Sequence, residues 1–253
     1  MKDSIEKYIN KITGKFGYVF IRYNEPEFNF HSNHYLRHNA RRLEHLASLR
    51  VSVAGMTVLE IGAGIGDHSH YYIDRGCQLT ITEVRDENLK YLRKRYPGEN
   101  IQYLNMGKPT LLDGSPFDVL HCYGLLYHLS DPELALEFLS RSCQKLLFLE
   151  TCVSFDSTKE INLVSEHAVN PTQANSGTGC RPSRAWLFEK LRSLFEYVYL
   201  PITQPNHEEF PLDWTAPEKH NVSLSRAIFI ASRKKIENDL LTSSFINKQI
   251  RHD

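Results

Sequence analysis

The sequence has little of several features that would assign it to a special class of protein. Its 253 residues include five cysteines, and no two of them form a C-x-x-C pair. An odd, scattered set of cysteines indicates reduced thiols rather than a disulfide framework. No stretch approaches the ~20 apolar residues of a membrane span, and the N-terminal residues lack the apolar run of a signal peptide. We therefore expect a cytoplasmic protein with no membrane partner.

The chain also has a formal net charge of zero at pH 7. Thirty Lys and Arg residues balance thirty Asp and Glu residues, so no global field attracts the chain to a polyanion. The hydrophobic fraction of 41% and the charged fraction of 24% are those of an ordinary globular protein. Neither a repeat nor a convincing linker divides the chain, and we expect one α/β domain over residues 1–253.

Short apolar runs alternate with helical patterns after residue 57, and this rhythm predicts a parallel sheet covered on both faces. The runs expected to be strands are Val58–Ile61, Leu79–Thr82, Ile101–Leu104, Phe117–Cys122 and Lys145–Leu149. Helices are expected over Tyr35–Leu49 and Arg184–Phe195. Two later β-rich runs, Tyr197–Leu200 and Ala227–Ala231, are predicted to pair as an antiparallel hairpin that closes the sheet.

A glycine-rich turn follows the first predicted strand. Gly62, Gly64 and Gly66 come directly after that strand and before a predicted helix, and glycines there let the backbone approach a ligand closely. A dinucleotide-binding turn needs G-x-G-x-x-G, whereas here Asp67 takes the place of the third glycine. A carboxylate there disfavours a pyrophosphate but suits S-adenosylmethionine (SAM), which carries a cationic sulfonium and amine. Glu83 ends the second strand, where it can accept hydrogen bonds from the ribose hydroxyls. A plain strand-to-helix turn is the alternative.

Several motifs resemble those of class I SAM-dependent methyltransferases. They run from the Val58–Gly66 turn through Glu83 and the Tyr123–Pro132 segment. The motifs resemble, more narrowly, the bacterial family that completes the carboxymethoxy group on the tRNA wobble uridine. The shared features are the G-L-L-Y-H run, L-F-L-E-T at the fifth strand, Arg181-Pro182-Ser183 with Trp186, Asp213-Trp214, and the run from Ser225 to Lys234.

This resemblance implies a Rossmann-like class I methyltransferase fold, with a seven-stranded, mostly parallel sheet, one antiparallel strand and helices on both faces. It also implies that Tyr127 and Arg226 hold the carboxylate of carboxy-SAM, the donor of the narrower family. That family's upstream Lys-Gly-Pro-Phe motif does not occur before Gly62, where Phe20–Pro26 stands instead. We therefore expect ordinary SAM as the cofactor and S-adenosylhomocysteine (SAH) as the product.

Glu60, Tyr123 and Tyr127 complete the expected cofactor pocket, Glu60 by contacting the donor's amine or by bracing the glycine turn. His128 is the candidate catalytic base, because it follows the fourth strand and an imidazole titrates near neutral pH. A helix cap or a core contact is the alternative for His128.

Three arginines are candidates for binding the substrate: Arg41, Arg181 and Arg226. Arg37, Arg41 and His45 recur at four-residue spacing beside Arg42 and could hold a phosphate, although a solvated helix face is the commoner explanation for such a stripe. Arg226 lies in an apolar strand and needs a buried anion, with Glu150 or Glu166 as structural alternatives. His207-Glu208-Glu209 has no second cluster at metal-ligand spacing, so no metal is expected.

We expect five parts within the domain: a helical and aromatic cap (1–50), a SAM-binding half (51–152), a substrate loop (153–183), a closing helix and hairpin (184–235), and a polar tail (236–253). The favoured function is O-methylation of a small hydroxylated molecule such as a sugar. The alternatives are modification of a tRNA anticodon and a SAM-binding scaffold without turnover. The oligomeric state is left open.

Overall fold

A computed structural model describes residues 2–20, 25–156, 158, 160–168 and 173–252. The centre of the fold is an eight-stranded sheet. Its strands are β1 (Thr57–Ile61), β2 (Gln78–Glu83), β3 (Asn100–Tyr103), β4 (Phe117–Tyr123), β5 (Cys143–Cys152), β8 (Tyr197–Pro201), β10 (Arg226–Ser232) and β11 (Leu241–Thr242). They lie in the order β11-β8-β10-β5-β4-β1-β2-β3.

The sheet confirms the expected fold class with one correction. Strands β1 to β5 are parallel neighbours, and β10 runs antiparallel to both β5 and β8. The expected closing hairpin is therefore present. The correction concerns the count, because the two-residue strand β11 adds an eighth strand beside β8. Sequence periodicity cannot find a strand this short.

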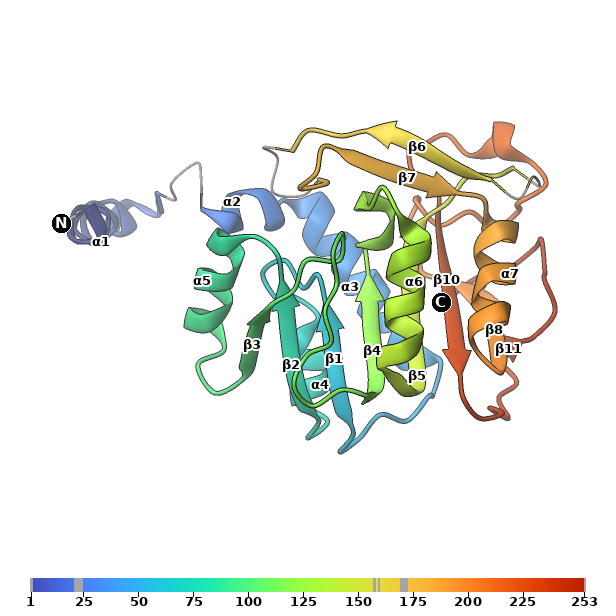
Figure 1. Cartoon of the computed structure of the whole chain (residues 1–253). Helices are drawn as coiled ribbons and strands as arrows, with labels where there is room; N and C mark the ends of the chain where they lie inside the picture. The colour runs from blue at the N-terminus through green and yellow to red at the C-terminus, as the bar shows by residue number, and fades with distance from the viewer. Residues whose placement is uncertain (1, 21–24, 157, 159, 169–172, 253) are drawn as a thin grey trace.

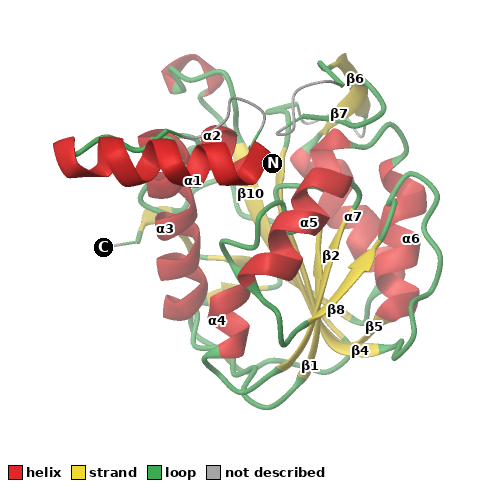
Figure 2. Ribbon diagram, turned by 90° about the vertical axis from the view of Figure 1, so that its left-hand side faces the viewer, coloured by secondary structure: helices red, strands yellow, loops and turns green. Residues whose placement is uncertain are grey.

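Helices cover both faces of the sheet (Figures 1 and 2). One face carries α3 (Asn33–Ser48), α4 (Ser69–Ile73) and α5 (Asp86–Arg95), and the other carries α6 (Pro132–Ser142) and α7 (Arg184–Leu194). Because side chains alternate along a strand, Val58 packs into the core of the first face and its neighbour Leu59 into the core of the second. Ser183 caps α7, its hydroxyl accepting a hydrogen bond from the Trp186 N–H at 3.1 Å.

The segment before the sheet begins with α1 (Lys2–Thr13), which projects from the body of the molecule (Figure 1). A short turn, η1 (Gly14–Phe16), follows, and α2 (Pro26–Phe30) precedes α3. Phe30 is buried against the sheet's upper edge. In the part of the chain that the structure describes, none of the helices combines the length and the apolar character needed to cross a membrane.

A hairpin occupies the segment that the sequence assigned to a loop. β6 (Ile161–Ser165) and β7 (Thr178–Pro182) pair antiparallel above the carboxyl ends of the central strands (Figure 1). β7 packs on the turn η2 (Leu126–His128), which follows β4. The hairpin is only partly buried, so its strands lack the apolar alternation that reveals a strand in a sequence.

The C-terminal tail is more closely attached than its polar composition suggested. β12 (Ile250–Arg251) pairs with β9 (Thr203–Gln204), and the Asn238 side chain donates to Leu49 O at 2.7 Å. A short turn, η3 (Pro217–Lys219), lies in the connection that leads to β10. Gln249 is buried and holds the Trp214 indole N–H at 2.9 Å.

Candidate active site

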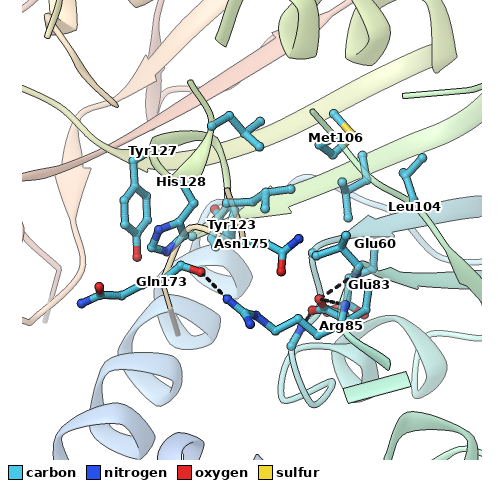
Figure 3. A pocket seen from close by; sticks show the side chains of 18 of the residues that line it. Glu60, Glu83, Arg85, Leu104, Met106, Tyr123, Tyr127, His128, Gln173 and Asn175 are labelled. Atoms are coloured by element: carbon cyan, nitrogen blue, oxygen red, sulfur yellow. Dashed lines mark hydrogen bonds between the residues drawn. The ribbon is translucent and has the colours of Figure 1, made fainter. Parts of the chain in front are cut away.

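One continuous cavity of about 340 Å³ lies at the carboxyl ends of the parallel strands, where open α/β sheets bind ligands. This volume is within the range of small-molecule sites. Its walls come from the glycine turn after β1, the end of β2, the β4–η2 connection and helix α3, and residues 173, 175 and 176 also line it. Figure 3 shows these side chains converging from strands that are far apart in the sequence.

The glycine turn is built so that only glycine fits. Gly62, Gly64 and Gly66 all have positive φ, at 68°, 60° and 80°. A Cβ on Gly64 would lie 3.0 Å from the Phe30 ring, and one on Gly66 would lie 2.8 Å from a Leu92 methyl. The tight turn leaves the backbone bare toward the cavity. Gly62 and Gly64 line the cavity, whereas Gly66 does not and packs behind the turn against Leu92 and Tyr96.

Glu83 is held rigidly at the end of β2. Its carboxylate accepts hydrogen bonds from the backbone N–H groups of Val84 at 2.7 Å, Arg85 at 2.9 Å and Gly64 at 2.9 Å. These three hydrogen bonds lower the pKa of Glu83, but burial has the larger effect and raises the pKa above its ordinary value. The remaining lone pairs face the cavity, so Glu83 can accept further hydrogen bonds from a ligand's hydroxyl groups.

Glu60 lies beneath the turn. The Ser69 hydroxyl donates to Glu60 Oε2 at 2.6 Å, and burial raises the pKa of Glu60 to about 7. A cationic ligand group nearby would favour the charged form. Tyr123 lines the cavity's edge, but its ring also belongs to the core on the α3 face, so it is more a wall than a ligand contact.

His128 has a partner that the sequence analysis did not assign to it. Its Nδ1 lies 2.5 Å from Oε2 of Glu166, the residue that follows β6. Glu166 is itself fixed by the Ala174 N–H at 2.7 Å and by the Arg181 guanidinium at 3.3 Å. Since Nδ1 is engaged, Nε2 is the nitrogen of His128 that remains for a ligand in the cavity.

The electrostatic surroundings keep His128 neutral. Burial lowers the pKa of His128 below 6.5, opposed by the hydrogen bond and charge of Glu166. Burial also acts to raise the pKa of Glu166, but the hydrogen bond and charge of His128, the Ala174 N–H and the charge of Arg181 together outweigh it, and the pKa is lowered overall. A neutral imidazole oriented by a carboxylate is an arrangement that can accept a proton.

Tyr127 and Arg226 come together, as the resemblance implies, but in a different electrostatic setting. Arg226 Nη2 donates to the Tyr127 hydroxyl at 3.3 Å, and both residues line the cavity. Arg226 also pairs with Glu150 at 3.1 Å and with Glu209 at 2.5 Å. Glu150 further pairs with Arg42. The anion that Arg226 needs is thus supplied by the protein, which confirms the structural alternative with Glu150.

Two of the three arginines proposed to bind substrate lie elsewhere. Arg41 is on the outer face of α3, pairs with Glu44 at 2.6 Å and is not among the described residues that line the cavity. Its neighbour Arg42, one residue further round the helix, is the buried arginine that lines the cavity. Arg181 is not among the described residues that line the cavity. Its guanidinium instead contacts Tyr127 and Glu166, and it donates a hydrogen bond to Tyr127 O at 3.2 Å.

Arg85 forms a contact across the mouth of the cavity. Its guanidinium donates to Gln173 O at 3.0 Å and to Ala168 O at 3.1 Å, joining the end of β2 to the loop between β6 and β7 (Figure 3). Asn175, in the segment expected to form the substrate loop, lines the cavity. Asn170, in the same segment, lies outside the described residues.

Sequence reasoning missed Glu166 and His38 as residues of the site or its immediate support, and it named Arg42 only as part of a possible phosphate-binding stripe. Glu166 is 38 residues from His128 and sits in a polar stretch, where a carboxylate carries no periodic signal. His38 and Arg42 lie on the inner face of α3, four residues apart, and both line the cavity. The four-residue spacing of these two side chains can be seen in the sequence, but the sequence does not show which face of the helix is buried.

Comparisons with known proteins agree with this geometry. Residues 59–146 match the family model described as a methyltransferase domain. A ubiquinone biosynthesis O-methyltransferase of Idiomarina loihiensis is 30% identical over 137 residues, covering 53% of this chain and 54% of the relative. One from Bordetella avium is 27% identical over the same length. The chain thus matches about half the length of these curated relatives.

Solved structures show the same fold. The N-terminal domain of EvdMO1, crystallised in the presence of SAH and D-fucose, superposes with a TM-score of 0.60 at 20% identity, covering 80% of this chain and 85% of that one. A SAM-dependent methyltransferase from Mesorhizobium loti gives 0.56 at 15% identity, covering 78% and 100%. The chain therefore matches a methyltransferase domain over residues 59–146 and has the Rossmann-like fold of these solved structures.

Proposed function

We propose that this protein transfers a methyl group from SAM to a hydroxyl of a compact small molecule, such as a sugar or another hydroxylated metabolite. The observation that carries the proposal is the continuity of the cavity. It joins the glycine turn and Glu83 at one end to His128, backed by Glu166, at the other. A donor site and a proton acceptor thus open into one enclosed space.

The residues present suit each part of such a reaction. SAM supplies the methyl group on a positively charged sulfur, so the protein mainly aligns the acceptor and removes its proton. Glu83 accepts hydrogen bonds from the cofactor's ribose, and the bare glycine backbone lets the cofactor lie close to β1. His128 takes the hydroxyl proton at Nε2. Glu166, accepting from Nδ1–H, holds the ring in that tautomer and stabilises the charge that develops on it.

The size of the cavity supports a small acceptor. A volume of about 340 Å³ is shared between cofactor and acceptor. Arg85 ties down the loop at the mouth, which limits entry and excludes water from the transferring methyl group. The relatives' names point the same way. The Idiomarina protein is named as an O-methyltransferase, and the EvdMO1 domain was crystallised with a sugar.

Modification of a tRNA anticodon, with carboxy-SAM as the donor, is the weaker hypothesis. Arg226 is the residue that would have to bind the extra carboxylate, yet its charge is matched by Glu150 and Glu209. An added anion there would face two buried carboxylates. We expect mass spectrometry of the ligand released from freshly purified protein to find SAM or SAH. A species heavier than SAM by a carboxyl group would restore the tRNA reading.

The proposal is tested with a panel of acceptors. Purified protein is incubated with methyl-labelled SAM and, separately, with sugars and nucleotide sugars, phenolic metabolites and bulk tRNA. We expect label on an oxygen of a small acceptor and none on tRNA. Labelled tRNA, with transfer falling steeply as salt rises, would contradict the small-molecule assignment. If the protein binds SAM but transfers no methyl group to any acceptor in the panel, the alternative of a SAM-binding scaffold is favoured. Slow hydrolysis of SAM by water counts as no transfer.

A further inference from the structure

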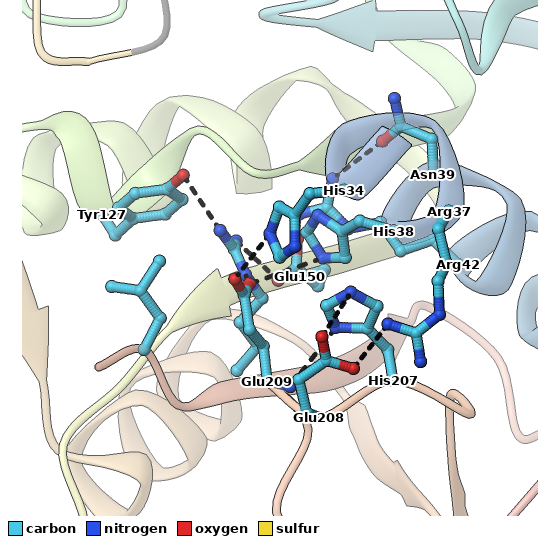
Figure 4. Close-up of polar contacts among 12 residues, drawn as sticks. His34, Arg37, His38, Asn39, Arg42, Tyr127, Glu150, His207, Glu208 and Glu209 are labelled. Atoms are coloured by element: carbon cyan, nitrogen blue, oxygen red, sulfur yellow. Dashed lines mark hydrogen bonds and ion pairs between the residues drawn. The ribbon is translucent and has the colours of Figure 1, made fainter. Parts of the chain in front are cut away.

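A cluster of histidines and carboxylates lies between helix α3 and the segment before β10, on the outer side of the cavity (Figure 4). His34 and His38 are one helical turn apart and both face His207, with ring centroids 5.3 and 4.7 Å from it. Glu208 and Glu209 follow His207 directly. Residues about 170 positions apart in the sequence thus form one imidazole-rich group.

Three members of this cluster have the arrangement of metal ligands. One ligand atom each of His38, His207 and Glu209 lies within 4.8 Å of the others, and all three residues are buried. Small side-chain rotations bring such atoms to the ~2.0–2.2 Å that zinc requires. His34 Nε2 lies 3.2 Å from Glu209 Oε1, beside the group, and is a fourth possible donor atom.

The histidines are unsatisfied without a ligand. Nε2 of His38 and Nε2 of His207 are buried and have no hydrogen-bond partner among the described residues. Their side chains are 4% and 0% exposed. A carboxylate oxygen lies near each nitrogen but beyond hydrogen-bond distance, Glu209 Oε2 at 3.8 Å from His38 and Glu208 Oε1 at 3.7 Å from His207. Two buried ring nitrogens without hydrogen bonds cost free energy, which a shared cation would recover.

The neighbouring charges leave room for a cation. Arg226 occupies Oε2 of Glu209, so Oε1 is the oxygen available to a metal. Arg37 is neutralised by Glu208 at 2.6 Å. The Glu209 N–H approaches His207 Nδ1 at 3.3 Å, a long contact that is given up when coordination at Nε2 places the ring proton on Nδ1.

We propose that His38, His207 and Glu209, with His34 as a fourth ligand, form a binding site for a divalent transition-metal ion such as Zn²⁺ or Co²⁺. Mixed imidazole and carboxylate donors suit these ions better than Mg²⁺ or Ca²⁺. His34 and Glu208 are on the exposed side and provide the entry path. The ion would clamp α3 to the segment before β10, next to the cavity wall formed by His38 and Arg226.

The test needs no turnover and so is independent of the proposed methyl transfer. Chelator-treated full-length protein is titrated with Co²⁺ alone and followed by visible absorption. We expect d–d bands that saturate at one ion per chain and disappear when Zn²⁺ is added, because zinc binds such sites more tightly. Featureless binding that does not saturate at one equivalent would overturn the proposal.

Variants locate the ion. His207→Ala should weaken Co²⁺ binding by more than the ~10–100-fold typical of outer-shell changes. His34→Ala should weaken it too, and this side chain is 56% exposed, so the variant is expected to fold even if His207→Ala does not. His70→Ala, which removes an exposed histidine on α4, is the control and should leave binding unchanged. Equal Co²⁺ affinity in His34→Ala, folded His207→Ala and the wild type would place the ion elsewhere.

Discussion

His128 and Glu166 carry the chemistry at the scale of single residues. His128 accepts a proton only as the neutral imidazole, and burial lowers its pKa below 6.5. Turnover should therefore be full at neutral pH and fall as the pH drops through this lowered pKa. His128→Ala should reduce kcat by ~10²–10⁴ at pH 7 with little change in SAM affinity.

Glu166→Gln gives a sharper test of the pair. It removes the carboxylate that raises the pKa of His128, so the acid limb of the kcat profile should move to lower pH. The plateau should fall as well, because the developing imidazolium loses its partner. His167→Ala, an exposed histidine beside Glu166, is the control and should match the wild type. An unshifted profile in Glu166→Gln would mean that the pair is only structural.

The hairpin is the element that holds Glu166 in place. Gly179 on β7 lies against η2, where a Cβ would collide with Tyr127 O and come within 2.8 Å of Glu166 Oε1. Gly179→Ala should push the hairpin away from His128, with an overpacking cost of ~1–3 kcal/mol. We expect kcat to fall while the Kd for SAH stays constant, because β7 packs on η2, which carries His128, and not on the strand that leads into the glycine turn among the main contacts of the described residues.

Kinetics and SAH titration of the same preparation check this prediction. Gly98→Ala is the matched control, since a Cβ at that exposed turn meets nothing within 4 Å. Wild-type kcat in Gly179→Ala would show that the hairpin does not position the base. A parallel loss of SAH affinity would show that the change spreads beyond the acceptor side.

The elements differ in how far the sequence reveals them. Buried parallel strands such as β1 and β4 read as continuous apolar runs, and the glycine turn with Glu83 identifies the cofactor end. The hairpin β6–β7 and the short strand β11 are partly exposed, and their strand character comes from their pairing rather than from an apolar pattern. The pairing of His128 with Glu166 depends on that hairpin, so the sequence around either residue does not predict it.

A buried charge network links the two halves of the whole molecule. Glu150 on β5 pairs with Arg42 from α3 and with Arg226 from β10, and all three side chains are at most 6% exposed. Glu150→Gln leaves two buried guanidiniums short of a carboxylate, and breaking a buried ion pair in this way costs about 3–5 kcal/mol. We expect the free energy of unfolding in urea at pH 7 to fall by about that amount.

Glu44→Gln is the comparison for this measurement. It breaks the exposed Arg41–Glu44 pair, which solvent screens, so the urea midpoint should not move measurably. If the urea midpoint of Glu150→Gln equals that of the wild type, the charge of Glu150 contributes nothing to the free energy of unfolding.

The central claim is that the glycine turn and Glu83 bind SAM, and calorimetric titration tests it most directly. Folded protein stripped of endogenous ligand is titrated with SAM and with SAH. We predict one site per chain for both ligands. Affinity should be weaker by ~1–3 kcal/mol in Glu83→Ala and unchanged in Glu87→Ala, which alters an exposed carboxylate nearby. No heat with either ligand, in protein shown to be folded, would contradict the account.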